Sequence, residues 1–291
     1  MKKLIALLTV LSLLMVGFLT GCGEKSGGGA KSGDGAGVVK VIDIALTEEE
    51  YAFGVDKNQP ELLEEVNKFI AKIKSDGTYE EILNKYFGDG TPTPVTSAEL
   101  DPSKDQLVVA TNAAFEPFEY MSGDKYLGID MEIAALLAEH LGKELVISNM
   151  DFEAVCLSVG QSKADIAMAG LTIKEERKEY VTFSDKYHDA AQMLIVKASD
   201  TRFDDCKTAE DVEAVLNSLD SKTKIGVQTG TTGEFYVRGD EEWGFSGYDV
   251  ECVGYKSGSL AVQDMLNGNI DLVIIDEAPA KCIVEAFNEM N

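Results

Sequence analysis

The chain has 291 residues, 45% of them apolar and only 6 of them proline, which excludes disorder over most of its length and predicts one large or two medium-sized cores. It carries 51 acidic against 26 basic residues, a formal net charge of −25. Such a charge excludes a nucleic-acid surface and electrostatic adhesion to anionic lipid.

The N-terminal residues 1–21 have the pattern of a secretory signal peptide: two lysines, an apolar run, and small residues before Cys22. The ending LTGC resembles a bacterial lipobox, which implies cleavage before Cys22 and lipid attachment to it. We therefore expect the protein at the cell membrane, on its extracytoplasmic face, touching the bilayer through the lipid anchor only. Residues 22–37 are rich in glycine and predict a flexible tether. The alternative is a plain secreted protein with an incidental cysteine.

The next segment looks like the end of a domain rather than its beginning. The sequence ALTEEEYAFGVDKNQPELLEEVNKFIAKIKSDGTYEEILNKYF, residues 45–87, predicts one short strand in YAFGV and then two helices. These elements are too few to bury a core alone. Residues 88–105, which begin GDGTPTPV, are predicted to be a linker.

From Gln106 onward, predicted strands and helices alternate in two series, which indicates two α/β lobes with mainly parallel sheets. In the first series, the helix of MEIAALLAEHLG should begin at Asp130 and end at Gly142. The predicted strands are LVVAT, ELVISN, ADIAMAG and QMLIVKA in the first series, and KIGVQTG, VECVGY and DLVIID in the second. The helices of the second series are predicted from Thr232, in SLAVQDMLNGN and in APAKCIVEAF.

Polar residues follow the carboxyl ends of these strands, where open α/β sheets bind their ligands. They are Asn112, Gly170, Thr172, Gln228, Thr231, Thr232 and Asp276. If the two lobes face each other, these residues line a cleft between them.

Two charged residues and one helix start suggest what the cleft binds. Arg177 has a guanidinium suited to gripping a carboxylate, although it could instead be a surface arginine paired with Glu175 or Glu176. In QTGTTGE, free amides at the start of a helix can accept an anion, and a Walker lysine is missing. Asp276 ends an apolar strand, where an ammonium group would relieve the cost of a buried carboxylate; it could also cap the next helix.

Aromatic side chains, among them Phe115 and Phe152, could form apolar walls of the cleft or belong to an ordinary core. A group that binds a carboxylate, a group that binds an ammonium ion and apolar walls together match the parts of a free α-amino acid. No cofactor and no metal are expected, because the chain has only two histidines and no C-x-x-C pair. The cysteines after Cys22 could pair or be small buried hydrophobes; they are Cys156, Cys206, Cys252 and Cys282.

Three sequence motifs together resemble those of one known protein family. AGLTIKEER, VTFSD and GVQTGTTGE, in this order, resemble the polar amino-acid solute-binding proteins of ABC transporters, over roughly Val38 to the C-terminus. The resemblance implies a two-lobed, hinge-closing type II periplasmic-binding fold, free amino acid and permease subunits as partners, a monomer, and no catalysis.

The resemblance also implies roles for the candidate residues. Arg177, with the main-chain amides of Thr172 and Thr232, would hold the ligand carboxylate. Asp276, the Gly170 carbonyl and the Thr172 hydroxyl would hold its ammonium group, and Phe115 and Phe152 would contact its side chain. Selectivity would lie with Asn112, Gln228 and Ile275. Because Asn112 is neutral, we expect a polar uncharged ligand, with Glu116 and Glu119 leaving basic ligands open.

The order of the segments departs from that of the family. In the family, a strand like VKVID, a hinge strand like YAFGV and helices ending in GTYEEILNKYF close the chain, whereas here they come first. A circular permutation is the simplest interpretation, with residues 88–105 joining the usual ends. A decayed fusion is its rival. Pairing of VVKVID with the sheet of residues 224–275 would favour permutation, and a detached segment would refute it.

On this interpretation, residues 50–195 form lobe 1, and residues 38–49 and 196–291 form lobe 2. The hinge would cross near Tyr51–Val55 and near Gln192–Lys197. Two other functions stay open: a ligand-binding sensor subunit, and an enzyme similar to cyclohexadienyl dehydratases. His188 is expected on a surface turn, away from any catalytic set.

Overall fold

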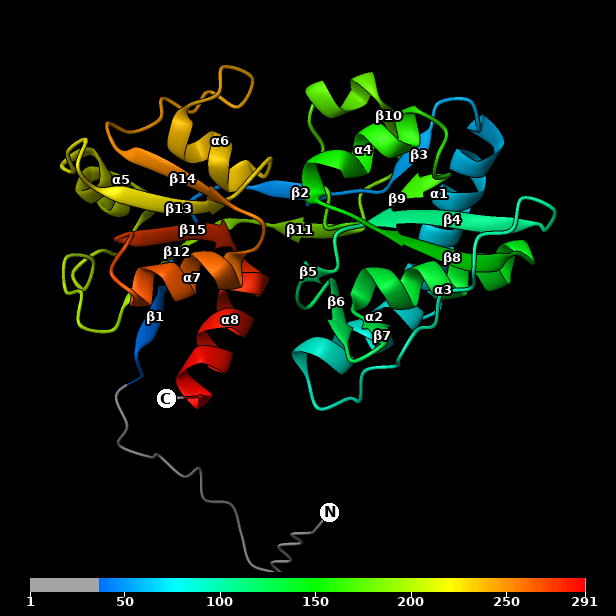
Figure 1. Cartoon of the computed structure of the whole chain (residues 1–291), viewed down its shortest axis with the longest axis horizontal. Helices are drawn as coiled ribbons and strands as arrows, with labels where there is room; N and C mark the ends of the chain where they lie inside the picture. Colours follow the sequence, from blue (N-terminus) through cyan, green and yellow to red (C-terminus); the bar gives the residue numbers. More distant parts are fainter. Residues whose placement is uncertain (1–36, 291) are drawn as a thin grey trace, which may run out of the picture. The chain divides into compact units, whose positions relative to one another are not determined.

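The computed structural model describes residues 37–290, so the predicted signal peptide, Cys22 and residues 22–36 of the tether lie outside the described residues. Two lobes, each built on a five-stranded sheet, stand side by side, with β2 and β11 between them (Figure 1). The two-lobed type II fold expected from the sequence is confirmed.

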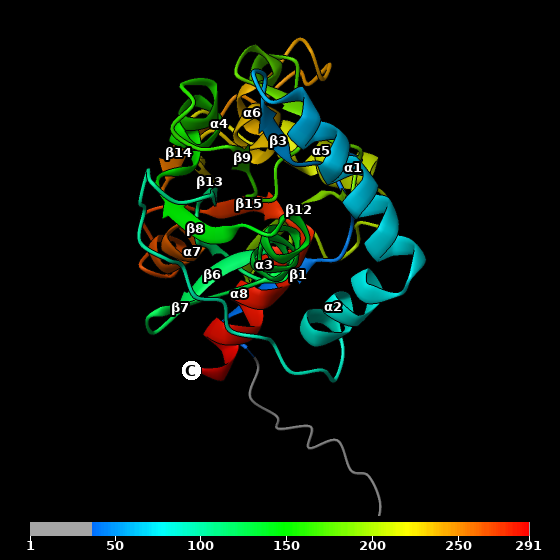
Figure 2. The same ribbon diagram turned by 90° about the vertical axis from the view of Figure 1, so that its right-hand side faces the viewer.

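Lobe 1 contains a sheet in the order β10-β3-β9-β4-β8. Its strands are β3 (Gly54–Asp56), β4 (Gln106–Thr111), β8 (Glu144–Asn149), β9 (Ile166–Ala167) and β10 (Val181–Phe183). A small sheet adds β5 (Ala114–Phe115), β6 (Glu119–Ser122) and β7 (Lys125–Leu127). The helices are α1 (Pro60–Ser75), α2 (Thr78–Phe87), α3 (Ile129–Leu141), α4 (Phe152–Gly160) and the 3₁₀ turn η1 (Glu176–Glu179). Figure 2 shows this lobe from its outer side, with α1 and α2 along one flank.

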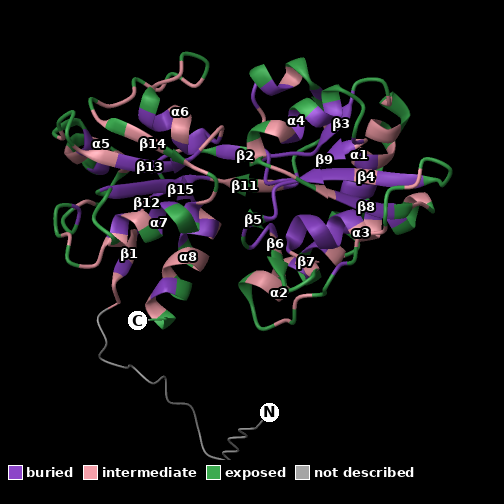
Figure 3. Cartoon of the chain, viewed as in Figure 1, coloured by how far each residue is buried: buried purple, intermediate pink, exposed green. Residues whose placement is uncertain are grey.

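Lobe 2 contains a sheet in the order β1-β12-β15-β13-β14. Its strands are β1 (Val39–Ile42), β12 (Gln192–Lys197), β13 (Lys224–Gln228), β14 (Glu251–Tyr255) and β15 (Leu272–Asp276). The helices are α5 (Ala209–Asn217), α6 (Thr232–Arg238), α7 (Gly258–Leu266) and α8 (Glu277–Glu289). In both lobes the central strands of the sheet are largely buried, as their apolar runs require (Figure 3).

Both sheets are mainly parallel, as expected, with one strand of the five running against the others in each. In lobe 2, β13 runs parallel to β14 and β15, but β12 is antiparallel to both β15 and β1. In lobe 1, β4 runs parallel to β8 and β9, but β3 is antiparallel to both β9 and β10. The antiparallel strands are those next to the hinge, where the chain enters each sheet from the other lobe.

The hinge consists of β2 (Glu49–Tyr51) and β11 (His188–Ala190), which pair antiparallel between the lobes. The expected crossing near Gln192–Lys197 is therefore wrong, because those residues form β12 inside the sheet of lobe 2 and do not belong to lobe 1. The run YAFGV divides between two elements: Tyr51 ends the hinge strand, and Gly54 and Val55 belong to β3.

The first described strand is part of the second lobe. Residues Val39–Ile42 pair in register with Lys197–Leu194 of β12. The Asn288 side chain of α8 accepts hydrogen bonds from the amides of Val38 and Val39 and donates one to the Val39 carbonyl. The predicted pairing of VVKVID with the sheet of residues 224–275 is confirmed, since β12 in turn pairs with β15.

The α1 and α3 helices show how the sequence forms lobe 1. Val66, Phe69, Ile70 and Ile73 recur at helical spacing on α1 and are buried, as an amphipathic helix requires. Gly142 ends α3 in a left-handed conformation at φ 68°, as predicted. Asp130, however, does not begin α3; Gly128 occupies the N-cap position, and Asp130 is buried in the first turn.

Candidate ligand-binding site

A small pocket of about 230 Å³, its opening to solvent included, lies between the lobes. It is lined by Phe115, Phe152, Gly170, Thr172 and Arg177 from lobe 1, and by Gln228, Thr231, Thr232 and Asp276 from lobe 2. Nine of the ten predicted ligand-binding residues are therefore brought together. The tenth, Asn112, is buried beside them and accepts a hydrogen bond of 3.0 Å from Gln228 Nε2.

Arg177 is held at the pocket by backbone groups of both lobes. Its guanidinium donates to the carbonyl of Thr172 in its own lobe and, at 2.9 Å, to that of Gly230 across the cleft. The guanidinium carbon lies 5.2 Å from the centre of the Phe152 ring, at cation–π distance. Arg177 is buried, so it is not the surface arginine paired with Glu175 or Glu176 that its spacing allowed.

The start of α6 faces the pocket from lobe 2. Thr231 occupies the N-cap position but makes no side-chain cap, since its hydroxyl donates to the Gln228 carbonyl at 2.7 Å. The first amides of a helix have no partner within the helix, and they carry its positive dipole end. Together with Arg177, this helix start makes a region of the pocket suited to a carboxylate.

Gly170 brings the main chain of lobe 1 close to the aromatic wall. Its φ is 52°, and a Cβ at this position would lie 2.9 Å from the Phe115 ring. Its amide donates to Oδ2 of Asp130 at 3.0 Å, and the Tyr187 hydroxyl donates to Oδ1 of the same carboxyl group. Asp130 thus fixes the loop that carries Gly170, a role the sequence did not reveal.

Asp276 and Glu49 place two buried carboxyl groups near the pocket. Asp276 takes the N-cap position of α8 without a side-chain cap, and its Oδ1 accepts a hydrogen bond from the Tyr51 hydroxyl. Burial, with a further contribution from the negative charge of Glu49, raises the pKa of Asp276 to about 7. An ammonium group beside Asp276 would favour its charged form.

Glu49 determines whether the Thr172 hydroxyl can donate or accept a hydrogen bond in the pocket. Its carboxylate accepts hydrogen bonds from Thr47 Oγ1 (2.7 Å), Thr172 Oγ1 (2.8 Å) and Gln192 Nε2 (2.9 Å). Because Thr172 donates its only hydroxyl proton to Glu49, it can only accept from any group in the pocket. Thr232 Oγ1 lies 3.3 Å from this hydroxyl.

Lys174 links the lobes at the rim. Its ammonium group lies 2.9 Å from Glu242, 3.0 Å from Asp240 and 4.8 Å from the centre of the Phe235 ring, all in lobe 2. The Glu175 amide also donates to Glu242, at 2.7 Å. The lobes are thus connected across the cleft.

Sequence reasoning did not assign Glu49, Gln192 or Lys174 to the site. Glu49 lies in a run of three glutamates, and only the register of β2 shows which one is buried. His188 is not on a surface turn; it lies in the hinge strand β11, where its Nδ1 is 2.9 Å from the Tyr79 hydroxyl.

Glu116 and Glu119 do not line the pocket. Glu119 is fully buried, and neither of its carboxylate oxygens has a hydrogen-bond partner. Burial, with Asp130 and Asp276 nearby, raises the pKa of Glu119 well above its usual value, which favours its neutral form. Ile275 is buried and lines a neighbouring cavity with Glu116.

Cys156, Cys206, Cys252 and Cys282 are all free thiols. Among residues 37–290, no cluster of three or more histidine, cysteine or acidic side chains could hold a metal ion. Within the same range, no helix combines the length and the apolar character needed to cross a membrane.

Known proteins are similar to this chain over much of its length. The arginine-binding extracellular protein ArtP of Bacillus subtilis is 32% identical over 184 residues, which are 62% of this chain and 65% of ArtP. The L-cystine-binding protein TcyJ of Escherichia coli is 28% identical over 185 residues, 63% of each protein. The chain thus spans slightly less than two thirds of the length of these relatives.

The chain is also similar to a solved structure of an amino-acid-binding protein. The ancestral amino acid-binding protein AncCDT-1, a precursor of cyclohexadienyl dehydratase, is 29% identical with a TM-score of 0.53, over 62% of this chain and 74% of the other. Residues 11–89 and 107–271 match one family in two separate stretches. The chain belongs to the bacterial extracellular solute-binding proteins, family 3.

Proposed function

We propose that the protein encloses a free polar, uncharged L-amino acid between its lobes and delivers it to an ABC importer. The observation that carries this proposal is the pocket, which brings a guanidinium from lobe 1 together with a helix start and a buried carboxyl group from lobe 2. The arginine- and cystine-binding relatives support an amino acid as the ligand class.

We assign the ends of the ligand as follows. Its carboxylate lies against Arg177 and the amides of Thr172 and Thr232. Its ammonium group lies against Asp276, the Gly170 carbonyl and the Thr172 hydroxyl, which must act as an acceptor because it donates to Glu49. Phe115 and Phe152 contact the ligand side chain.

Asn112 and Gln228 select the ligand side chain. Asn112 donates to the Met150 carbonyl and accepts from Gln228, while Oε1 of Gln228 is buried with no hydrogen-bond partner. This free acceptor favours a ligand with a neutral donor, such as an amide or hydroxyl group, since an unpartnered buried acceptor costs about 1–3 kcal/mol. A cationic ligand side chain would find no carboxylate to pair with beside Asn112 and Gln228.

A calorimetric panel of the twenty amino acids plus cystine tests the proposal. We expect glutamine or another neutral polar amino acid to bind best, and Arg177→Ala to abolish binding. Arg202→Ala is the matched control, because Arg202 is exposed and paired with Asp200, away from the cleft. Arginine binding far tighter than glutamine would contradict the proposed selectivity; no binding by any amino acid would contradict the function.

We further propose that the protein binds without catalysis. The pocket holds no histidine or cysteine that could act as a nucleophile or general base. The purified protein is expected to leave prephenate and arogenate unchanged. Turnover of either compound would instead support the cyclohexadienyl-dehydratase-like alternative.

We also infer a lipid-anchored monomer that works with permease subunits. Cys22→Ala should move the protein from the membrane fraction to the medium, with its amino-acid affinity unchanged. A protein that stays at the membrane after this substitution would exclude the lipid anchor.

The N-terminal segment is, on our proposal, the family's closing segment in a permuted order. In support, residues 39–87 supply β1 to the sheet of lobe 2, β2 to the hinge, and β3, α1 and α2 to lobe 1. The two separate family matches are divided near residues 88–105. Deleting residues 38–104 should prevent folding, as judged by circular dichroism and thermal unfolding. A deleted protein that folds and binds normally would support the decayed fusion instead.

A further inference from the structure

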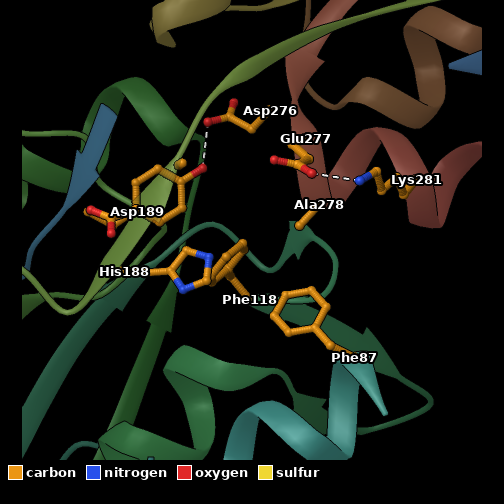
Figure 4. A pocket seen from close by; sticks show the side chains of 10 residues that line it. Phe87, Phe118, His188, Asp189, Asp276, Glu277, Ala278 and Lys281 are labelled. Atoms are coloured by element: carbon orange, nitrogen blue, oxygen red, sulfur yellow. Dashed lines mark hydrogen bonds and ion pairs between the residues drawn. The ribbon is translucent and has the colours of Figure 1, made fainter. Parts of the chain in front are cut away.

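A second cavity lies beside the hinge, behind the carboxyl group of Asp276. Its walls come from the hinge strands, from lobe 1 through Phe87 and Phe118, and from the start of α8 in lobe 2 (Figure 4). The space measures about 590 Å³ including its open mouth. Tyr51 and Asp276, joined by their hydrogen bond, line this cavity, and only Asp276 also lines the ligand pocket.

Aromatic rings make up much of the wall. The His188 ring packs edge-on against Phe118, with centres 5.0 Å apart, and lies nearly parallel to Phe87, with centres 6.2 Å apart. Phe118 also packs edge-on against Tyr51, at 5.1 Å. Phe87 is 52% exposed, a large fraction for a phenylalanine held in an aromatic cluster. Such a group of rings offers several π faces to a cation.

Acidic side chains outnumber basic ones in the lining of the cavity. Its lining includes the carboxyl groups of Asp189, Asp276 and Glu277 against a single ammonium group, that of Lys281. Lys281 is itself paired with Glu277 at 2.6 Å and lies 3.6 Å from Asp43. Burial lowers the pKa of His188, so its ring is neutral near pH 7 and does not repel a cation.

The carboxyl groups that line the cavity already have hydrogen-bond or ion-pair partners, which favours a quaternary over a primary ammonium ion. Asp189 is paired with Lys186, Glu277 with Lys281, and Asp276 accepts from Tyr51. A primary ammonium ion brings three N–H donors, which need free acceptors when they leave water. A quaternary ammonium ion has no N–H donor and gains from ring faces and nearby carboxylates alone.

We propose that this hinge cavity is a second binding site, for a small methylated ammonium ion. The cation would contact the rings of Phe87, Phe118 and His188, with Glu277 at its rim. Because both lobes and both hinge strands contribute to the wall, the occupied cavity favours the lobe arrangement seen here. Its occupation is therefore coupled to closure of the ligand pocket.

Titration of the full chain with choline, followed by NMR or calorimetry at constant ionic strength, tests this site. The matched compound is 3,3-dimethyl-1-butanol, which has the shape of choline without its charge. We expect choline to bind, and tetramethylammonium likewise, while the neutral compound binds at least about threefold more weakly, as the loss of a cation–π contact predicts. Equal binding of choline and the neutral compound would overturn the proposal.

Two variants locate the bound cation. Phe87→Ala should weaken choline binding about 3- to 30-fold, in line with loss of one cation–π wall. Leu260→Ala is the control, because Leu260 is also 52% exposed but lies on α7, outside the cavity lining. Loss of choline binding in Phe152→Ala but not in Phe87→Ala would place the cation in the ligand pocket and overturn the proposal. The test uses no amino acid, so it is independent of the function proposed above.

Discussion

The hydroxyl of Tyr51, in the hinge strand β2, donates a hydrogen bond to the carboxyl group of Asp276, at the end of β15 in lobe 2. Both side chains are buried. The bond therefore connects the hinge directly to the group that we assign to the ligand ammonium. The hydrogen bond favours the charged form of Asp276 and lowers its pKa, against the larger effect of burial.

Tyr51→Phe should weaken binding of the best amino acid from the calorimetric panel by roughly 10- to 150-fold at pH 7, since a hydrogen bond to a charged group contributes about 1.5–3 kcal/mol. The reason is that Asp276 loses a donor and ionises less readily. Tyr236→Phe removes the same atom from another buried tyrosine, whose hydroxyl donates to Glu213 and which does not line the pocket. Equal losses of affinity in the two variants would contradict a specific role for the Tyr51 hydroxyl.

The ligand-free protein should lose stability as the pH rises from about 4 to 7. Burial raises the pKa values of Asp130 and Asp276 to about 7, above the unfolded value of about 3.9. Between these limits the folded state binds more protons than the unfolded state, so the free energy of unfolding falls with increasing pH. Urea unfolding at several pH values measures this slope.

Asp276→Asn should make that slope shallower. Asp124→Asn is the control, because the Asp124 side chain is 89% exposed and its removal changes the net charge equally. An unchanged slope in Asp276→Asn would show that Asp276 titrates normally in the folded protein.

Glu49→Gln should shift the pH dependence of amino-acid binding. Glu49 raises the pKa of Asp276 through its charge, so removing that charge lets Asp276 ionise at lower pH. The pH at which affinity increases should therefore move downward, an effect that a merely structural role would not produce. Glu50→Gln, one position along the same strand and exposed, should leave the pH profile unchanged. An identical profile for Glu49→Gln and the unmodified protein would argue against this role.

Much of the fold follows from local sequence patterns. Apolar runs such as DLVIID and the spacing of Val66, Phe69, Ile70 and Ile73 predict their strand and helix, because burial of one face or run stabilises each element. The direction of β12 could not be predicted this way. The run QMLIVK suits either strand direction, and β12 runs antiparallel to β15 because it enters the sheet directly from the hinge strand β11, with one residue between the two strands.

The candidate site was predictable where a residue directly follows a strand or lies at the start of a helix, as Asn112, Thr232 and Asp276 do. It was not predictable where a residue reaches the site from the hinge. Glu49 and Gln192 contact each other from segments 143 positions apart, and only their side-chain hydrogen bond shows that they share the site. Lys174 likewise gains its role only from the acidic residues of the other lobe.

Lys174→Ala should weaken amino-acid binding by roughly 3- to 30-fold and speed up ligand release. Lys174 is 5% exposed and contacts Asp240, Glu242 and the Phe235 ring, so the variant loses ion pairs that connect the lobes only when they are close. Partly buried charge pairs contribute more than exposed ones, which contribute about 0–1 kcal/mol. Isothermal calorimetry and stopped-flow dissociation measure the two effects.

Lys178→Ala is the matched control for Lys174→Ala. Lys178 lies four residues along the chain, is half-buried, and pairs with Glu175 of its own lobe. Its removal should leave affinity and release rate unchanged. High salt should reduce the difference between unmodified protein and Lys174→Ala, because screening weakens the same interlobe pairs. If both lysine variants lose affinity equally, the change comes from net charge, and the Lys174 contacts do not hold the lobes together.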